Sequence, residues 1–175
     1  MKNSVIILLF LFSINLSGQK PVSNVEFVGY KNQVLLAKKE AMKAPGKLST
    51  GDVITVGCEE GKCFFRIEYK GRTIEQVVGD DITQLAIYEY DFGLDGDNEI
   101  VVVNDYKGTS YMFIYSYSRG IIQELFEKEI MNNKTTLKKE YIECNVPGGS
   151  DLIWNYYQGQ FWKMTPYKNE GSGGI

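Results

Sequence analysis

Three segments of the chain share one pattern, and this pattern limits the possible folds more than any other feature of the sequence. Each segment has an aromatic-rich run in which residue character alternates, then a glycine turn, then a second apolar run. The segments are Cys63 to Ile74, Tyr111 to Ile122 and Asp151 to Trp162. Alternation with a period of two is typical of β-strands that bury one face. From Asp52 onward, the sequence therefore predicts β-hairpins.

The spacing of the three segments indicates how the hairpins are arranged. The offsets from Cys63 to Tyr111 and from Tyr117 to Tyr157 both fall in the range of about 40 to 50 residues that is typical of propeller blades. Three units cannot close a propeller ring, and unrelated hairpins could also resemble one another. We therefore expect an all-β fold of antiparallel sheets, either an incomplete propeller or a sandwich.

The N-terminal residues have the pattern of a secretory signal peptide. Lys2 supplies a positive charge, Val5 to Phe12 is an unbroken apolar run, and Gly18 ends a possible cleavage site. The apolar run is too short to span a bilayer. We expect a mature protein that is periplasmic or secreted. The predicted division is a signal peptide over 1–18, a single β domain over 19–168 and a flexible tail over 169–175.

Composition narrows the possible functions. The chain has no His and a formal net charge of −3. Without His, His-based catalytic triads, His general bases and most zinc sites are excluded, and no other pairing of base and nucleophile is visible. A mildly acidic chain without a basic patch is a poor nucleic-acid binder and is better matched to a cationic partner. We predict a protein that is not an enzyme, does not bind nucleic acid and does not insert into a membrane.

The three cysteines leave the disulfide pairing open. Cys58 and Cys63 flank a short hairpin loop, so that a cross-strand bridge between them is plausible in an oxidising compartment. Pairing of either one with Cys144 is the other option, and the sequence alone does not choose. The third thiol is expected to be buried and free.

An acidic loop between two apolar runs is the main candidate site. Asp91, Asp95 and Glu99 stand at positions 1, 5 and 9 of the loop, and Gly96 stands where the chain must turn sharply. Asp97, at position 7, can offer its backbone carbonyl. Ca²⁺ prefers six to eight oxygen ligands at about 2.3–2.6 Å. The loop therefore predicts a calcium site, although an acidic, glycine-rich hairpin loop would have a similar sequence.

The calcium loop differs from an EF-hand and resembles another group. Position 12 is Val102 instead of a bidentate Glu, and apolar strand-like runs flank the loop. The motif resembles the calcium loops of integrin-like and VCBS β-propeller blades, in which D-x-[DN]-x-[DN]-G-x-x-[DE] precedes a strand. This chain has Gly93 at position 3, where that family has Asp or Asn, so one oxygen ligand is missing.

A second candidate site follows the strand that leaves the acidic loop. It consists of Tyr106, Lys107, Gly108, Thr109, Ser110 and Tyr111. A tight turn carrying hydroxyls and an ammonium could enter a cleft lined with carboxylates, such as that of a glycoside hydrolase. We expect the calcium site a few residues upstream to stiffen this turn, which would reduce the entropy lost on docking. An ordinary hairpin turn is the simpler alternative.

The turn resembles the S-G-x-x-Y inhibitory loop of periplasmic bacterial lysozyme inhibitors. Gly108, Thr109 and Tyr111 match that motif, whereas Lys107 replaces its Ser. Together with the signal peptide and the calcium loop, the turn is similar to periplasmic calcium-binding immunity proteins that neutralise lysozyme-like effectors of type IV secretion systems. The resemblance covers residues 82–117 and implies an inhibitor of a cationic cell-wall hydrolase.

Aromatic residues near the C-terminus support a rival function. They could stack on sugar rings, although alternation within strands makes core packing the default. The rival is a calcium-dependent glycan- or protein-binding module without inhibitory activity. The aromatic residues concerned are Trp154, Tyr156, Tyr157, Phe161 and Trp162.

Overall fold

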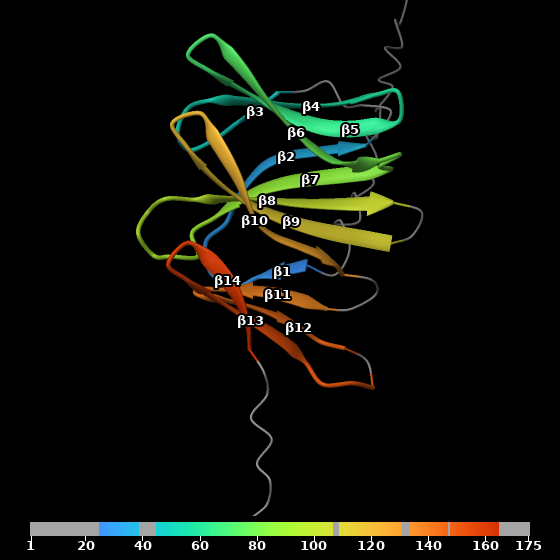
Figure 1. The fold of residues 1–175 in the computed structure, drawn as a ribbon, viewed down its shortest axis with the longest axis vertical. Helices are drawn as coiled ribbons and strands as arrows, with labels where there is room; N and C mark the ends of the chain where they lie inside the picture. Colours follow the sequence, from blue (N-terminus) through green and yellow to red (C-terminus); the bar gives the residue numbers. More distant parts are fainter. Residues whose placement is uncertain (1–24, 39–44, 107–108, 131–133, 147, 165–175) are drawn as a thin grey trace, which may run out of the picture.

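The computed structural model describes residues 25–38, 45–106, 109–130, 134–146 and 148–164, which form three β-sheets and no helix. From top to bottom in Figure 1 they are the upper, central and lower sheets. The upper sheet contains, in spatial order, β3 (Gly46–Lys47), β4 (Val53–Glu59), β5 (Lys62–Tyr69) and β6 (Arg72–Asp80). The central sheet contains β10 (Ile121–Glu129), β9 (Thr109–Ser118), β8 (Glu99–Tyr106), β7 (Gln84–Tyr90) and β2 (Asn32–Lys38). The lower sheet contains β1 (Val25–Phe27), β11 (Thr135–Lys138), β12 (Tyr141–Cys144), β13 (Leu152–Tyr157) and β14 (Gln160–Met164).

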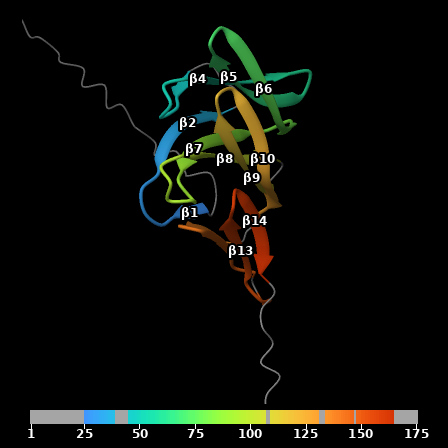
Figure 2. The ribbon, with the colours of Figure 1, turned by 60° about the vertical axis from the view of Figure 1, so that its left-hand side comes forward.

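The all-β prediction is confirmed. Consecutive strands pair in three antiparallel meanders, β3 to β6, β7 to β10 and β11 to β14, and each meander belongs to a different sheet. β2 adds antiparallel to β7, whereas β1 adds parallel to β11. The sheets keep their vertical order when the molecule is turned (Figure 2).

The three similar sequence segments are the last hairpins of the three meanders. The turns at Lys70-Gly71, Arg119-Gly120 and Gln158-Gly159 all have positive φ at both residues. Positive φ at both central positions defines the type I′ turn, whose twist matches that of the paired strands. The glycine therefore recurs because a two-residue hairpin turn needs it at this position.

Two apolar cores separate the sheets, so the central sheet is covered on both faces. Along β8, Ile100 and Val102 pack into the core shared with the upper sheet, and Val101 and Val103 pack into the core shared with the lower sheet. All four side chains are at most 1% exposed. Strands covered on both faces have continuous apolar runs, which explains why this stretch of β8 does not alternate.

Several sequence predictions fall on residues that the structure does not describe. The signal peptide over 1–18 and the tail over 169–175 lie outside the described residues. Among the residues that are described, no helix is long and apolar enough to cross a membrane.

A disulfide joins Cys58 to Cys63, which face each other across the β4–β5 hairpin. This is the cross-strand option of the two pairings that the sequence left open. Cys144 is a free thiol buried in the core between the central and lower sheets.

Candidate metal centre

The acidic loop spans residues 91–98 and connects β7 to β8 at one end of the central sheet. Tyr90 and Glu99 are paired in the β7–β8 ladder and close the base of the loop. Gly96 has a φ of 87°, as expected for the sharp turn, and Leu94 also has a positive φ of 59°. The loop therefore reverses direction through left-handed backbone at two places.

Asp91 and Asp95 organise the backbone of the loop. One carboxylate oxygen of Asp91 accepts a hydrogen bond from the Gly96 N–H at 3.1 Å, and Asp95 Oδ1 accepts one from the Asp97 N–H at 3.0 Å. The other oxygen of Asp91, Oδ1, is buried and has no hydrogen-bond partner among the described residues. A buried carboxylate oxygen without a partner is unfavourable, so the loop contains an acceptor that a cation could satisfy.

Glu99 is buried at the base of the loop, with 5% of its surface exposed. Its Oε1 accepts a hydrogen bond from the Tyr156 hydroxyl at 2.6 Å, and its Oε2 accepts one from the Phe92 N–H at 3.1 Å. Burial raises the pKa of the Glu99 carboxyl, the two hydrogen bonds oppose this shift, and the charge on Asp95 adds to it. The charged carboxylate is therefore short of compensating positive charge.

Tyr156 reaches the loop from β13 in the lower sheet. Burial raises the pKa of its hydroxyl, and the hydrogen bond to Glu99 and the charges of Glu99, Asp95 and Asp91 raise it further. All three predicted acidic ligands thus act electrostatically on one half-buried phenol. The acids lie within electrostatic reach of one another even though different parts of the loop hold them.

Tyr156 also lies beside Gly93, at position 3 of the loop. A Cβ atom on Gly93 would lie 3.3 Å from Tyr156 Cε1 and 3.2 Å from Asp95 Oδ2. Both distances are shorter than ordinary van der Waals contact, so these neighbours would have to shift by a few tenths of an ångström to admit a side chain at this position. The ring of Tyr156 therefore limits the space for a side chain at this position of the loop.

The carboxylates are close but do not converge. Among the described residues, no three acidic, Cys or His side chains are placed to hold one metal ion. Asp95 accepts the Asp97 N–H bond through Oδ1, and a carboxylate can also bind a cation through its second oxygen. The residues fit calcium in their chemistry, since all the donors are oxygen atoms.

The second predicted site lies at the other end of β8. Tyr106 pairs with Thr109, and the connecting residues Lys107 and Gly108 lie outside the described residues. Ser110 is 7% exposed, and its hydroxyl donates to the Asp105 carboxylate. Tyr111 is half-buried against the core between the upper and central sheets. The Ser110 hydroxyl and the Tyr111 ring therefore make contacts within the fold.

The predicted metal site and this hairpin lie at opposite ends of β8, so any stiffening of the hairpin by a bound cation would have to act along that strand. β8 is extended from Glu99 to Tyr106 and separates the two sites (Figure 1). With a rise of about 3.3 Å per residue, the two ends lie roughly 23 Å apart. The two sites are close in sequence, but the extended β8 strand between them places them at opposite ends of the central sheet.

Two residues of the acidic loop region were not identified from the sequence. Tyr156 lies 57 positions beyond Glu99 in the chain, and its place in an aromatic-rich strand suggested core packing or sugar stacking. Phe92 lies within the loop, but an apolar residue in an acidic motif gave no indication of a role. Its fully buried ring fixes the loop to the lower core.

The comparisons with known proteins identify no relative of this chain. No protein-family model matches the chain, and no curated protein or solved structure matches it significantly.

Proposed function

We propose that the 91–98 loop and Glu99 bind Ca²⁺. The observation that carries this proposal is the buried Oδ1 of Asp91, which has no hydrogen-bond partner in the described part of the chain. The desolvated Glu99 carboxylate lies at the base of the same loop. A divalent cation would compensate the charge of Glu99 and satisfy the Asp91 oxygen. Asp91, Asp95 and Glu99 would supply carboxylate oxygens, and Asp97 would supply its backbone carbonyl.

Calcium is expected to raise the melting temperature of the purified protein, and a chelator is expected to reverse the change. At one hundred times the dissociation constant, binding adds about 2.7 kcal/mol to the free energy of unfolding. For a domain of this size, that corresponds to roughly 5 to 10 °C in melting temperature. Differential scanning fluorimetry with calcium, and separately with excess chelator, measures the shift.

Two variants of the loop provide a matched comparison. Asp95→Asn and Asp97→Asn each remove one exposed carboxylate from the same loop, but only Asp95 is proposed to bind through its side chain. We expect Asp95→Asn to abolish most of the calcium-dependent shift and Asp97→Asn to retain most of it. An unchanged melting temperature of the native protein in calcium, or equal losses in both variants, would contradict the proposed ligands.

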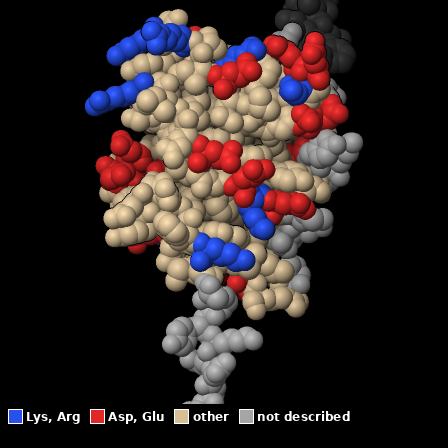
Figure 3. Space-filling view, in the orientation of Figure 1, with Lys and Arg blue, Asp and Glu red and all other residues tan. Residues whose placement is uncertain are grey.

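We further propose that the protein acts by binding and inhibiting a cationic, lysozyme-like cell-wall hydrolase through the β8–β9 hairpin. The charge around this hairpin supports a cationic partner. Glu129 lies opposite Tyr111 in the β9–β10 ladder, Glu127 lies opposite Phe113, and both glutamates are exposed. Acidic side chains form a diagonal row across the middle of the face in Figure 3, over the β9–β10 region of Figure 1.

Inhibition is tested by measuring the hydrolysis of peptidoglycan by cationic lysozymes in the presence of the purified protein. We expect Gly108→Trp and Tyr111→Ala to abolish inhibition, because they change the end of the hairpin that is proposed to enter the cleft. Gln160→Trp is the control, since it places the same large side chain at an exposed position of the lower sheet. Inhibition by the hairpin variants equal to that of the native protein would exclude the hairpin as the inhibitory element.

The alternative, a glycan-binding module, has one observation in its favour. Tyr157 and Trp162 are 64% and 56% exposed, and they are diagonal neighbours on one face of the β13–β14 hairpin. The other three candidate aromatics, Trp154, Tyr156 and Phe161, pack into the lower core, as the default interpretation predicted. Binding to glycans without inhibition of any hydrolase, lost in Trp162→Ala, would favour this alternative.

A further inference from the structure

A pocket of about 260 Å³ lies between the upper and central sheets, beside the β8–β9 hairpin. Its walls are the buried side chains of Val78, Ile82 and Phe113, together with the half-buried ring of Tyr111. A water molecule in the liquid takes about 30 Å³, and pockets for drug-sized ligands measure about 300–1,000 Å³. The space therefore suits a chain of several heavy atoms, comparable to one long side chain.

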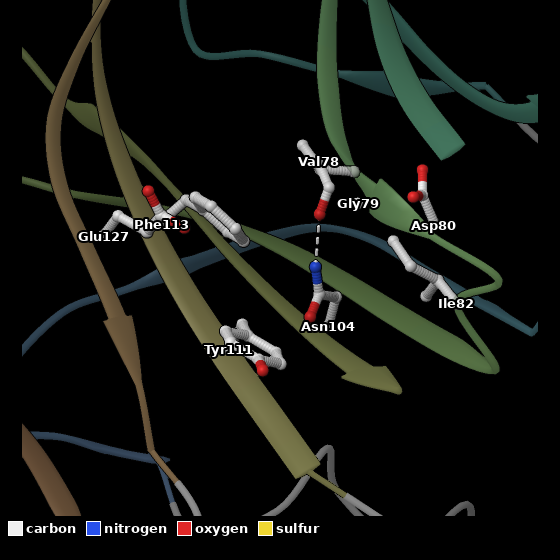
Figure 4. A pocket seen from close by; sticks show the side chains of 8 residues that line it. All are labelled: Val78, Gly79, Asp80, Ile82, Asn104, Tyr111, Phe113 and Glu127. Atoms are coloured by element: carbon white, nitrogen blue, oxygen red, sulfur yellow. Dashed lines mark hydrogen bonds between the residues drawn. The ribbon is translucent and has the colours of Figure 1, made fainter. Parts of the chain in front are cut away.

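The polar group at the base of the pocket is Asn104 on β8, which is 2% exposed. Its Nδ2 donates to the backbone carbonyl of Val78, and because a carbonyl can only accept, this contact fixes which way the amide is turned. Its Oδ1 is buried and without a partner among the described residues. In Figure 4 the amide lies between Ile82 and Tyr111, with Oδ1 on the Tyr111 side. The pocket thus contains an acceptor to which none of the described residues donates.

The rim of the pocket is acidic. Asp80 at the end of β6 and Glu127 on β10 lie on opposite sides of it, and both are exposed (Figure 4). Lys62 lies across the β5–β6 ladder from Asp80. Lys128 follows Glu127 but faces the lower core, where its Nζ lies 6.0 Å from the Trp154 ring. The carboxylates that line the pocket favour a positively charged ligand over a neutral or negative one.

We propose that this pocket binds a primary ammonium group carried on an unbranched aliphatic stem. The ammonium donates a hydrogen bond to Asn104 Oδ1, the methylene groups contact Val78 and Phe113, and the rim carboxylates attract the charge. A charged donor makes a stronger hydrogen bond than a neutral one. The group comes from a free alkylamine or from a lysine side chain of a bound protein. The proposal does not depend on calcium binding or on hydrolase inhibition.

Binding of n-pentylammonium to the purified full chain tests the inference, with n-pentanol as the neutral probe of the same stem. We expect saturable binding of the amine, followed by backbone amide NMR shifts at Val78, Asn104 and Tyr111, and binding of the alcohol at least about tenfold weaker. The blocked amino acid Nα-acetyl-lysine-N-methylamide distinguishes the two sources. If it binds as well as the free amine, a protein lysine can fill the pocket; if only the free amine binds, the pocket is specific for small amines.

Variants at the rim test the role of charge without changing the buried walls. We expect the double variant Asp80→Asn and Glu127→Gln to weaken binding of the amine about threefold to tenfold at low salt. Glu124→Gln, which removes a charge from the same strand outside the pocket, is expected to have little effect. Asn104→Leu is expected to abolish binding. Absence of saturable amine binding to the native chain, equal binding of pentanol, or shifts confined to other sheets would overturn the proposal.

Discussion

Phe92→Ala is expected to lower the free energy of unfolding by about 3 to 5 kcal/mol, the cost of removing a large aromatic side chain from a well-packed core. The ring is fully buried, and its centroid lies 4.7 Å from that of Tyr90 and 5.0 Å from that of Phe161. The backbone carbonyl of Phe92 also accepts a hydrogen bond from the Glu140 N–H at 3.1 Å. The variant should therefore loosen the acidic loop as well as the lower core. Urea unfolding followed by tryptophan fluorescence measures the change.

Phe92→Leu is the control for this experiment. Leucine keeps most of the apolar volume, so the loss should stay below about 1.5 kcal/mol. If Phe92 holds the loop in place, calcium affinity should fall in Phe92→Ala and be largely kept in Phe92→Leu. A loss of stability in Phe92→Ala that is no greater than in Phe92→Leu would mean that the ring does not anchor the loop.

Glu89→Ala is the second substitution with a large expected effect. Glu89 is 3% exposed, and its carboxylate accepts hydrogen bonds from the Ser49 N–H at 2.8 Å, the Ser49 hydroxyl at 2.7 Å and the Asn32 amide at 2.7 Å. Hydrogen bonds to a charged group contribute about 1.5–3 kcal/mol each and are not additive, so that loss of all three acceptor contacts should cost roughly 3 to 5 kcal/mol. The same unfolding measurement tests this prediction.

The hydrogen-bonded cluster of Glu89, Ser49 and Asn32 also connects separate parts of the fold. Ser49 precedes β4 in the upper sheet, Asn32 begins β2, and Asn98 in the acidic loop donates to the Ser49 hydroxyl at 3.1 Å. Glu89→Gln keeps one acceptor oxygen and should therefore cost less than Glu89→Ala. Because Glu89 is not a proposed ligand, Glu89→Gln should keep the calcium-dependent shift in melting temperature. Loss of that shift would show that the cluster, and not the loop acids alone, controls metal binding.

The strands and hairpins of this chain could largely be predicted from local sequence. The turn glycines Gly71, Gly120 and Gly159 sit where two-residue hairpin turns require positive φ, a constraint that acts between neighbouring residues. Alternation in the flanking runs placed the hairpins correctly. For the arrangement of the sheets, the sequence left two alternatives, an incomplete propeller or a sandwich. A hairpin sequence specifies which face is buried but not which sheet covers that face.

In the acidic loop, too, the local features were predictable from the sequence and the contacts with distant segments were not. The sequence identified its acids and its turn at Gly96, since ligand type and backbone conformation are local properties. It could not identify Tyr156, because the phenol comes from another sheet and is close to Glu99 only in the folded chain. The sequence likewise did not show that the ring of Tyr156 lies beside Gly93.

The sequence by itself therefore determined an all-β chain, the positions of its hairpins and an oxygen-rich acidic loop, because these depend on residue character and on contacts between near neighbours. Only the tertiary structure decided that the central sheet is covered on both faces and that Asn104 lies at the base of a pocket with an acidic rim. These features depend on contacts between segments far apart in the chain, and the pattern along one strand does not encode its distant neighbours.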